Sequence, residues 1–301
     1  MPGKTKNTGD YEYHEPVLLE SSLEYLIKDP SGNYADGTLG GGGHAQAIFQ
    51  RLDSGGKLTA FDKDPEAMDH CRRKFAKEIA SGRMDLINDS YSEISSIAGS
   101  RGLFDGFLLD LGVSSRQLDT ESRGLSYRVK APLDMRFGTK GKTAEDIVNS
   151  ANAAELERIF SRYGEEPLSR VISRRIVERR RGSTLKTTFD LRIVIEEVVS
   201  GKKIFKVLSR IFQALRIAVN DELGVLEETL NNAPEFLKPG GRIVVISYHS
   251  LEDRIVKNTF KELAKEDKLK IITPKPIAPS YQETKNNKRA RSAKMRVGEI
   301  E

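Results

Sequence analysis

The chain has 301 residues, of which 38% are hydrophobic and 31% are charged, a balance typical of a globular protein with an ordinary core. No apolar run approaches the roughly 20 residues that cross a bilayer. Residues 1–10 are polar and lack the apolar stretch of a signal peptide, so we expect neither a membrane span nor a secretory signal. The single cysteine excludes an internal disulfide framework and favours a cytoplasmic location.

The net charge of +5 is unevenly distributed along the chain. Residues 285–296 carry six basic groups and no acidic one, and residues 170–181 carry six arginines against Glu178. Such stretches suit a polyanion because each neutralised phosphate releases counterions. Taken singly, the first could be a disordered basic end and the second a solvated helix face. Together they favour a nucleic-acid partner.

The first third of the chain alternates strand and helix patterns. The expected strands are 33–36, 57–62, 83–88 and 104–110, and the expected helices are 45–52 and 65–80. A loop is expected between the last two strands. This order predicts a parallel sheet with right-handed crossovers.

After Asp110 the pattern changes to a polar loop over residues 114–142 and then to helices. The expected helices are 143–150, 153–162, 166–181, 188–200 and 204–231, with Thr143 and Thr188 as N-caps. A strand at 242–247, a helix at 251–265 and a strand at 269–273 follow. We therefore expect an α/β fold interrupted by a helical insertion of about 100 residues, a common domain size. The predicted limits are 1–115, 116–215 and 216–301.

The run from Asp36 to His44 contains four consecutive glycines between a strand and a helix N-terminus. Glycine tolerates positive φ and close approach, and a strand, a glycine turn and a helix form a nucleotide-cofactor site in many α/β folds. Asp62 ends the next strand, 22 residues after Gly40, where a carboxylate can accept both ribose hydroxyls. This much suits NAD and S-adenosylmethionine equally.

The position of Asp36 separates these two cofactors. It precedes the glycines, where a carboxylate repels a pyrophosphate but suits a cationic sulfonium ligand with an amino group. Residues 40–45 match the dinucleotide pattern only because glycine fills nearly every position. The turn therefore favours S-adenosylmethionine over NAD. Asp110, at the tip of an apolar strand, is expected beside this site and is well placed to meet a substrate amine.

Longer motifs lie along most of the chain. They are HEPVLL (14–19), the turn 36–44, DLGVSSRQLD (110–119), RGLSY (123–127), PLDMR (132–136), YGEE (163–166), FQALRIAVNDEL (212–223), YHSLEDR (248–254) and RARSAKMR (289–296). Most contain polar residues without an evident packing role, so their occurrence in this order is highly specific. Over these residues the chain resembles the bacterial 16S ribosomal RNA cytosine-N4 methyltransferases.

The resemblance implies a Rossmann-like class I S-adenosylmethionine-dependent methyltransferase sheet interrupted by an all-helical insertion domain. It also implies a reaction, methyl transfer from S-adenosylmethionine to the exocyclic N4 of a cytidine in the decoding region of 16S rRNA. The implied partner is the small ribosomal subunit. By position, the cofactor contacts of the family fall on Gly42, Gly43, His44, Asp62, Tyr91, Asp110 and Gln117.

The chain departs from the family pattern at two places. Lys206-Val-Leu-Ser-Arg210 stands where the family usually has His-Pro-Ala-Thr-Arg, and Leu125 stands where Phe is usual. The first departure lies in the insertion, so it bears on substrate docking more than on cofactor binding.

The substrate side of the site depends on a few polar residues. We expect Asp110 to accept hydrogen bonds from the N4 amine and to take up the released proton. Tyr248 either stacks on the base or packs in the core. His249 either contacts substrate or holds a strand-to-helix turn, with Ser250 as the helix cap. Arg136 is predicted to contact an RNA phosphate. Four scattered histidines and one cysteine do not form a metal site.

Two other functions stay open on this reasoning. One is an NAD-dependent oxidoreductase, and the other is a non-catalytic RNA-binding or assembly factor with a vestigial pocket. The intact turn and the carboxylates Asp62 and Asp110 argue against such decay. The sequence leaves open whether free rRNA or an assembled subunit is the substrate, and whether the chain dimerises.

Overall fold

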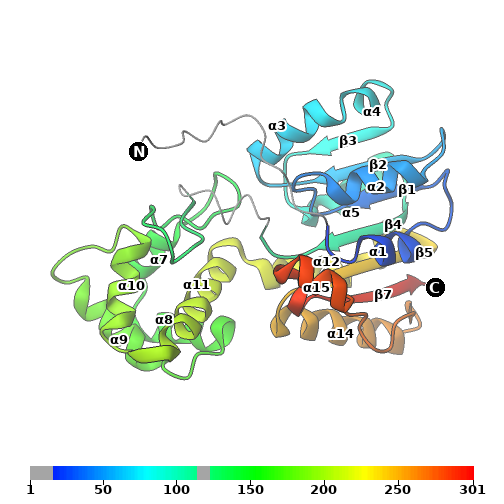
Figure 1. Cartoon of the computed structure of the whole chain (residues 1–301). Coiled ribbons are helices and arrows are strands. Elements are labelled where there is room, and N and C mark those ends of the chain that lie inside the picture. Colours follow the sequence, from blue (N-terminus) through cyan, green and yellow to red (C-terminus); the bar gives the residue numbers. More distant parts are fainter. Residues whose placement is uncertain (1–15, 114–122) are drawn as a thin grey trace.

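The computed structural model describes residues 16–113 and 123–301, which form a seven-stranded sheet flanked by helices and a separate group of helices beside it (Figure 1). The strand order is β3-β2-β1-β4-β5-β7-β6. The strands are β1 (Asn33–Asp36), β2 (Lys57–Phe61), β3 (Met84–Ile87), β4 (Phe104–Asp110), β5 (Leu237–Ser247), β6 (Leu269–Ile271) and β7 (Lys294–Ile300).

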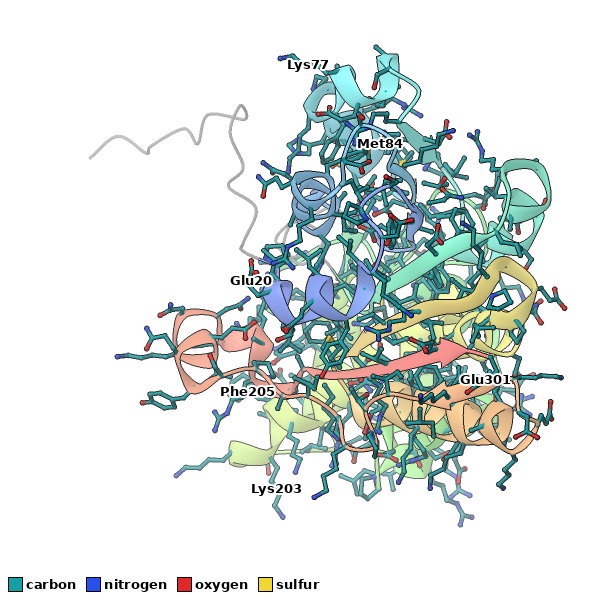
Figure 2. The ribbon with its side chains drawn as sticks, turned by 90° about the vertical axis from the view of Figure 1, so that its right-hand side faces the viewer. Glu20, Lys77, Met84, Lys203, Phe205 and Glu301 are labelled. Atoms are coloured by element: carbon teal, nitrogen blue, oxygen red, sulfur yellow. The ribbon has the colours of Figure 1, made fainter. Side chains whose placement is uncertain are left out.

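The first five strands are parallel, and for the first four the sequence predicts this arrangement. β7 is antiparallel to both of its neighbours, β5 and β6, so the complete sheet is mixed. Figure 2 shows β7 running across one face of the molecule toward Glu301. The possibility of a disordered basic end is therefore wrong. The last part of the basic stretch enters the sheet, because Met295 and Val297 alternate with charged residues and are buried in the core.

Side chains from successive strand residues enter two separate cores, one on each face of the sheet. One face is covered by α1 (Leu19–Leu26), α2 (Gly43–Arg51) and α3 (Pro65–Lys74). The other is covered by α5 (Ile94–Arg101), α12 (Glu222–Asn231), α13 (Ala233–Phe236) and α14 (Ser250–Lys265). Helices on both faces explain why residues 106–109 of β4 are buried without a break and carry no polar side chain.

The remaining long helices enclose a third core that runs from Leu125 to Leu215. They are α7 (Ala144–Ser150), α8 (Ala153–Gly164), α9 (Ser169–Arg179), α10 (Thr188–Glu196) and α11 (Ile204–Asn220). Figure 1 shows these helices in green and yellow-green, beside the sheet rather than on it. The predicted limit after residue 215 falls inside α11, and the domain limits themselves stay a prediction.

Several predicted elements differ from the observed ones. The loop expected between β3 and β4 contains η1 (Tyr91–Glu93) and α5, and the helix expected over 65–80 divides at Phe75 into α3 and α4 (Ala76–Ala80). The helix expected over 204–231 divides at Asp221, whose φ of 48° ends α11. The short elements η3 (Gly201–Lys203), α15 (Tyr281–Asn286) and η4 (Lys288–Ser292) complete the described fold.

Helix capping follows the sequence at one predicted position and shifts by one residue at two others. Thr143 caps α7 and forms a capping box with Asp146, as expected. The prediction for Thr188 is wrong, because Thr187 caps α10. Ser250 is not the cap of α14, because the ring of His249 takes that position. Among the residues described, each helix is too short or too polar to span a bilayer.

Candidate active site

A cavity of about 470 Å³ opens at the carboxyl ends of the parallel strands. Its walls come from the segments that directly follow β1 to β5, from α11 and α12, and from the segment before β7. Open α/β sheets bind their ligands at this edge, and sites for small molecules measure about 300–1,000 Å³. The cavity therefore lies where the sequence predicts the cofactor.

The glycine turn forms one wall of the cavity, and its glycines are sterically required. Gly42 has a φ of 70°, and a Cβ there would lie 2.6 Å from Cε2 of Phe75. Gly43 begins α2, and a Cβ on it would overlap the ring of Pro16. Only glycine fits both positions. Of these two predicted residues Gly43 borders the cavity, whereas Gly42 packs behind its wall against the core.

Asp62 directly follows β2 and borders the cavity. Its Oδ2 accepts a hydrogen bond from the backbone N–H of Gly40, and its Oδ1 accepts one from that of Asp64, each at 2.8 Å. Burial raises the pKa of Asp62 to about 6 in spite of these two hydrogen bonds. The carboxylate is thus held in place with lone pairs remaining for a ligand, which suits the predicted ribose contact.

Asp36 and His44 lie buried beside the turn. Oδ1 of Asp36 accepts a hydrogen bond from the backbone N–H of Thr38 at 3.0 Å. Oδ2 of Asp36 and Nε2 of His44 have no hydrogen-bond partner among the described residues. Burial raises the pKa of Asp36 to about 6 and lowers that of His44. A buried carboxylate oxygen without a hydrogen-bond partner is costly. Asp36 and His44 therefore each lack one hydrogen bond that would offset their burial.

Asp110 ends β4 and borders the same cavity. Its backbone N–H donates to Oγ1 of Thr38, its Oδ1 accepts from the hydroxyl of Tyr248, both at 2.7 Å, and its Oδ2 lies 3.6 Å from Nδ1 of His44. Burial raises the pKa of Asp110 to about 7, against the opposing effect of the Tyr248 hydrogen bond. Near neutral pH the carboxyl is therefore present in both protonation states, which suits a group that takes up a proton.

Tyr248 and His249 both border the cavity, immediately after β5. Tyr248 is expected either to stack on the base or to pack in the core, and its ring is partly buried and packs against the core on one face of the sheet. Its hydroxyl also donates to Asp110 across 138 residues of chain. Nδ1 of His249 accepts from the backbone N–H of Glu252, and its Nε2 lies 3.2 Å from Oε1 of the same residue. His249 thus holds the turn into α14, and its contact with substrate stays a prediction.

The remaining predicted cofactor residues are Tyr91 and Gln117. Tyr91 begins η1 after β3 and borders the cavity, where burial raises the pKa of its hydroxyl. Gln117 lies outside the described residues.

The wall formed by α11 and α12 contains an ion pair that the sequence analysis did not predict. Arg216 donates from Nε and Nη2 to the two carboxylate oxygens of Glu222, at 2.8 and 2.9 Å.

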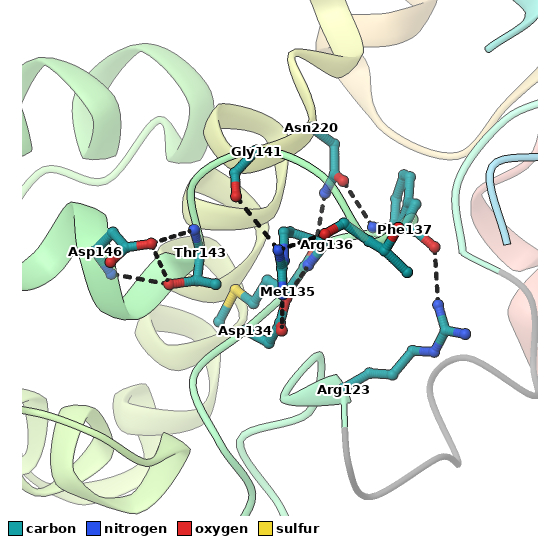
Figure 3. Close-up of polar contacts among 10 residues, drawn as sticks. Arg123, Asp134, Met135, Arg136, Phe137, Gly141, Thr143, Asp146 and Asn220 are labelled. Atoms are coloured by element: carbon teal, nitrogen blue, oxygen red, sulfur yellow. Dashed lines mark hydrogen bonds and ion pairs between the residues drawn. The ribbon is translucent and has the colours of Figure 1, made fainter. Parts of the chain in front are cut away.

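The side chain of Arg136 forms hydrogen bonds to other residues of its own loop (Figure 3). Its Nε and Nη2 donate to the two carboxylate oxygens of Asp134, each at 2.8 Å. Its Nη1 donates to the carbonyl oxygens of Thr139 and Gly141. These contacts hold the loop before α7, and an RNA-phosphate contact by Arg136 stays a prediction. Beside it, the side chain of Asn220 joins α11 to the same loop through the backbone of Met135 and Phe137.

The family of the chain follows from comparison with known proteins. The sequence profile described as the MraW methylase family matches residues 11–301. The chain belongs to the MraW methylase family. As a member of this family it is a methyltransferase with S-adenosylmethionine as its cofactor, and its sheet with the added helices is the Rossmann-like methyltransferase fold expected from the motifs. The oxidoreductase and the non-catalytic factor find no support.

Individual relatives agree over nearly their whole length. The ribosomal RNA small subunit methyltransferase H of Elusimicrobium minutum is 47% identical over 291 residues, which cover 95% of this chain and 98% of the relative. The protein of the same name from Halothermothrix orenii is 43% identical over 307 residues, with the same two coverages. The protein of the same name from Chlorobium phaeovibrioides is 46% identical over 314 residues, which cover 95% of this chain and 95% of the relative.

The residues around the cavity suit S-adenosylmethionine. The unpartnered oxygen of Asp36, beside the turn, and the partly buried carboxyl of Asp110, at the cavity wall, are acidic groups of the kind that suits a cationic ligand. Two backbone hydrogen bonds hold the carboxylate of Asp62 at the cavity wall, which suits a ribose, and the absence of a side chain at Gly43 suits the close approach of a ligand to the start of α2. No group of three or more metal-ligating side chains occurs among residues 16–113 and 123–301.

Proposed function

We propose that this methylase transfers a methyl group from S-adenosylmethionine to the exocyclic N4 of a cytidine in the decoding region of 16S rRNA. The observation that carries the proposal is the position of Asp110, whose carboxylate borders the cofactor cavity and accepts a hydrogen bond from the hydroxyl of Tyr248. The relatives' names contribute the small-subunit rRNA, and the motifs shared with cytosine-N4 methyltransferases contribute the base and the atom.

The N4 amine of cytosine is a poor nucleophile because its lone pair is delocalised into the ring. A site that methylates it must hold the amine in line with the methyl group and accept its hydrogen bonds as the lone pair becomes available. Asp110 in its ionised form accepts these hydrogen bonds and then the proton that leaves N4 as the new C–N bond forms. The hydroxyl of Tyr248 orients the carboxylate throughout.

The cofactor supplies the methyl group on a positively charged sulfur. We propose that Asp62 holds the ribose of the cofactor and that Tyr91 packs beside its adenine. Gly43 and His44 contact the cofactor where it lies along the turn. Asp36 and Asp110 complement its positive charge from the ends of β1 and β4. Gly42 contributes indirectly, by fixing the conformation of the turn. A cytidine in structured rRNA must leave its stack to reach this cavity.

The test uses radiolabelled S-adenosylmethionine and the purified protein with three substrates: small ribosomal subunits, free 16S rRNA and duplex DNA. Each labelled product is digested to nucleosides and identified by mass spectrometry. We expect N4-methylcytidine from at least one RNA substrate and none from the DNA. The absence of N4-methylcytidine from both RNA substrates would contradict the proposal, and the ratio of the two RNA rates shows which form is preferred.

A further inference from the structure

The basic stretch before β7 forms an ordered part of the surface. Ser280 caps α15 by accepting from the backbone N–H of Glu283, and Oε1 of Glu283 accepts from the backbone N–H of Leu18 at 2.6 Å. Ala290 and Ala293 are buried in the core of the sheet. Figure 2 shows this segment projecting from one side of the molecule, beside the start of β7. Its charges therefore have defined positions.

Apart from Arg289, the basic residues of this stretch fall into two groups. Lys294 and Arg296, within β7, both pair with Asp253, at 3.0 and 2.7 Å. Lys285, Lys288 and Arg291 precede β7 and are exposed, and none of these three forms an ion pair with another residue that the structure describes. The first group stabilises the fold. The second is available to a polyanion.

The second group lies next to the opening of the active-site cavity. Asn287, Arg289 and Ser292, which alternate with the three basic residues, are themselves part of the cavity lining. Tyr281 is 82% exposed and stands four residues before Lys285 in α15, so the two share one helix face. An exposed ring beside exposed cations is the combination that binds unpaired nucleotides.

The other basic stretch, in α9, has a different setting. Arg175 pairs with Glu178 and Glu197, and Arg180 donates to the carbonyl oxygen of Val148. No residue of α9 borders the cavity, and Figure 1 shows this helix at the outer end of the helical group. Three of its arginines, Arg170, Arg174 and Arg179, are exposed, like the cations before β7, and provide a matched comparison.

We propose that residues 281–292 form an RNA-docking surface that holds the strand on either side of the target nucleotide. Lys285, Lys288 and Arg291 neutralise its phosphates, and Tyr281 stacks on a neighbouring base. The surface lies beside the cavity, so a nucleotide turned out of its stack reaches Asp110 while its neighbours remain bound. This inference rests on the proposed function only in taking RNA as the substrate.

The experiment compares two triple variants with the same change in charge. K285Q/K288Q/R291Q removes the proposed phosphate contacts, and R170Q/R174Q/R179Q removes three cations from α9. Affinity for a fragment of small-subunit rRNA is measured directly at several salt concentrations, alongside KM and kcat for methylation and calorimetric binding of S-adenosylhomocysteine. Direct binding separates this inference from the proposed function, because RNA can bind even where no N4-methylcytidine forms.

We expect the first variant to bind RNA about 10- to 100-fold more weakly near 0.15 M salt, with the slope of log K against log salt reduced by about 2–3. In the methylation assay this variant should have a higher KM for RNA, and its affinity for S-adenosylhomocysteine should be unchanged. The α9 variant should change RNA affinity less than about threefold. Tyr281→Ala should weaken binding without changing the salt slope, because stacking releases no counterions. Equal losses in the two triple variants, or no loss in the first, would overturn the proposal.

Discussion

The carboxylates at the sheet edge and those of the helical group differ in whether they have cationic partners. Asp36, Asp62 and Asp110 lie at or directly after the ends of three strands, Asp36 buried and the other two partly buried, and none pairs with a lysine or arginine in the described part of the chain. Burial raises the pKa of each, to between about 6 and about 7. These groups are held at a cost to stability, which is a physical signature of a functional site.

In the helical group several acidic side chains have cationic partners. Glu196 pairs with Arg192 four residues earlier, and Asp134 binds Arg136 through both of its oxygens. The hydrogen bonds of Arg136 lower the pKa of Asp134 from its ordinary value. The difference teaches that charge in the helices holds structure, whereas the carboxylates at the sheet edge have no lysine or arginine partner among the described residues, as the proposed binding of a cationic ligand requires.

The largest expected effect comes from removing the carboxylate at the tip of β4. Asp110→Ala should lower the single-turnover rate of rRNA methylation by about 10²- to 10⁴-fold, because it removes the group that accepts the proton. Glu196→Ala, which removes a paired carboxylate from α10, should leave the rate unchanged. An equal rate for Asp110→Ala and wild type would remove Asp110 from any direct role.

The turn can be tested through stability. Gly42→Ala should lower the free energy of unfolding by about 1–3 kcal/mol, because it combines an unfavourable φ with a Cβ 2.6 Å from Phe75. Gly82→Ala is the matched control, with the same φ of 70° and nothing within 4 Å of its Cβ. Chemical denaturation of both variants separates the two effects. A loss no larger than that of Gly82→Ala would show that Gly42 is not needed for packing.

A pH dependence follows from the cost of ionising Asp110. Its pKa of about 7 in the folded state lies above the ordinary 3.8. The stability that the protonated form contributes is therefore fully present below pH 3.8 and is lost as the pH rises through 7. Asp110→Asn avoids this loss, so its melting temperature relative to wild type should rise between pH 5 and pH 8. A difference independent of pH would contradict the raised pKa.

The smallest effect is expected in the helical group. The Arg192–Glu196 pair is partly exposed, with Nε and Oε1 2.7 Å apart. Arg192→Gln should lower the free energy of unfolding by only about 0.3–0.5 kcal/mol, and less at high salt, because solvent and ions screen such pairs. Denaturation at two salt concentrations measures this. A loss of several kcal/mol would undo the contrast between the two regions.

Much of the fold follows from sequence because the strand patterns are local. The boundaries of β1 agree with the prediction, and its glycine turn and the carboxylates at the ends of β1, β2 and β4 lie at one edge, as parallel strands require. α5 was missed because its sequence, ISSIAGSR, is rich in serine and glycine and buries only Ile94 and Ala98. β7 was missed because three of its seven residues, Lys294, Arg296 and Glu299, are charged and obscure its buried apolar residues.

The connections within the site could not be predicted, since they depend on contacts between distant segments. The hydroxyl of Tyr248 reaches Asp110 across 138 residues, and no local pattern encodes that hydrogen bond. The capping role of His249 is local, but histidine is an unusual N-cap and serine is a common one, so Ser250 was the natural expectation. The packing of Gly42 against Phe75 likewise depends on how α3 lies on the turn.

On this account, the carboxylates at the sheet edge lack a cationic partner until the cofactor binds. The most direct test is the number of protons released on binding. Calorimetry at pH 6.5 in buffers of different ionisation enthalpy gives this number for S-adenosylmethionine and for S-adenosylhomocysteine, which lacks the positive sulfur. A cation lowers the pKa of nearby carboxyls, so S-adenosylmethionine should release about 0.5 proton or more beyond its neutral analogue, and the excess should vanish by pH 8.5. Equal proton release for the two ligands at pH 6.5 would contradict the account.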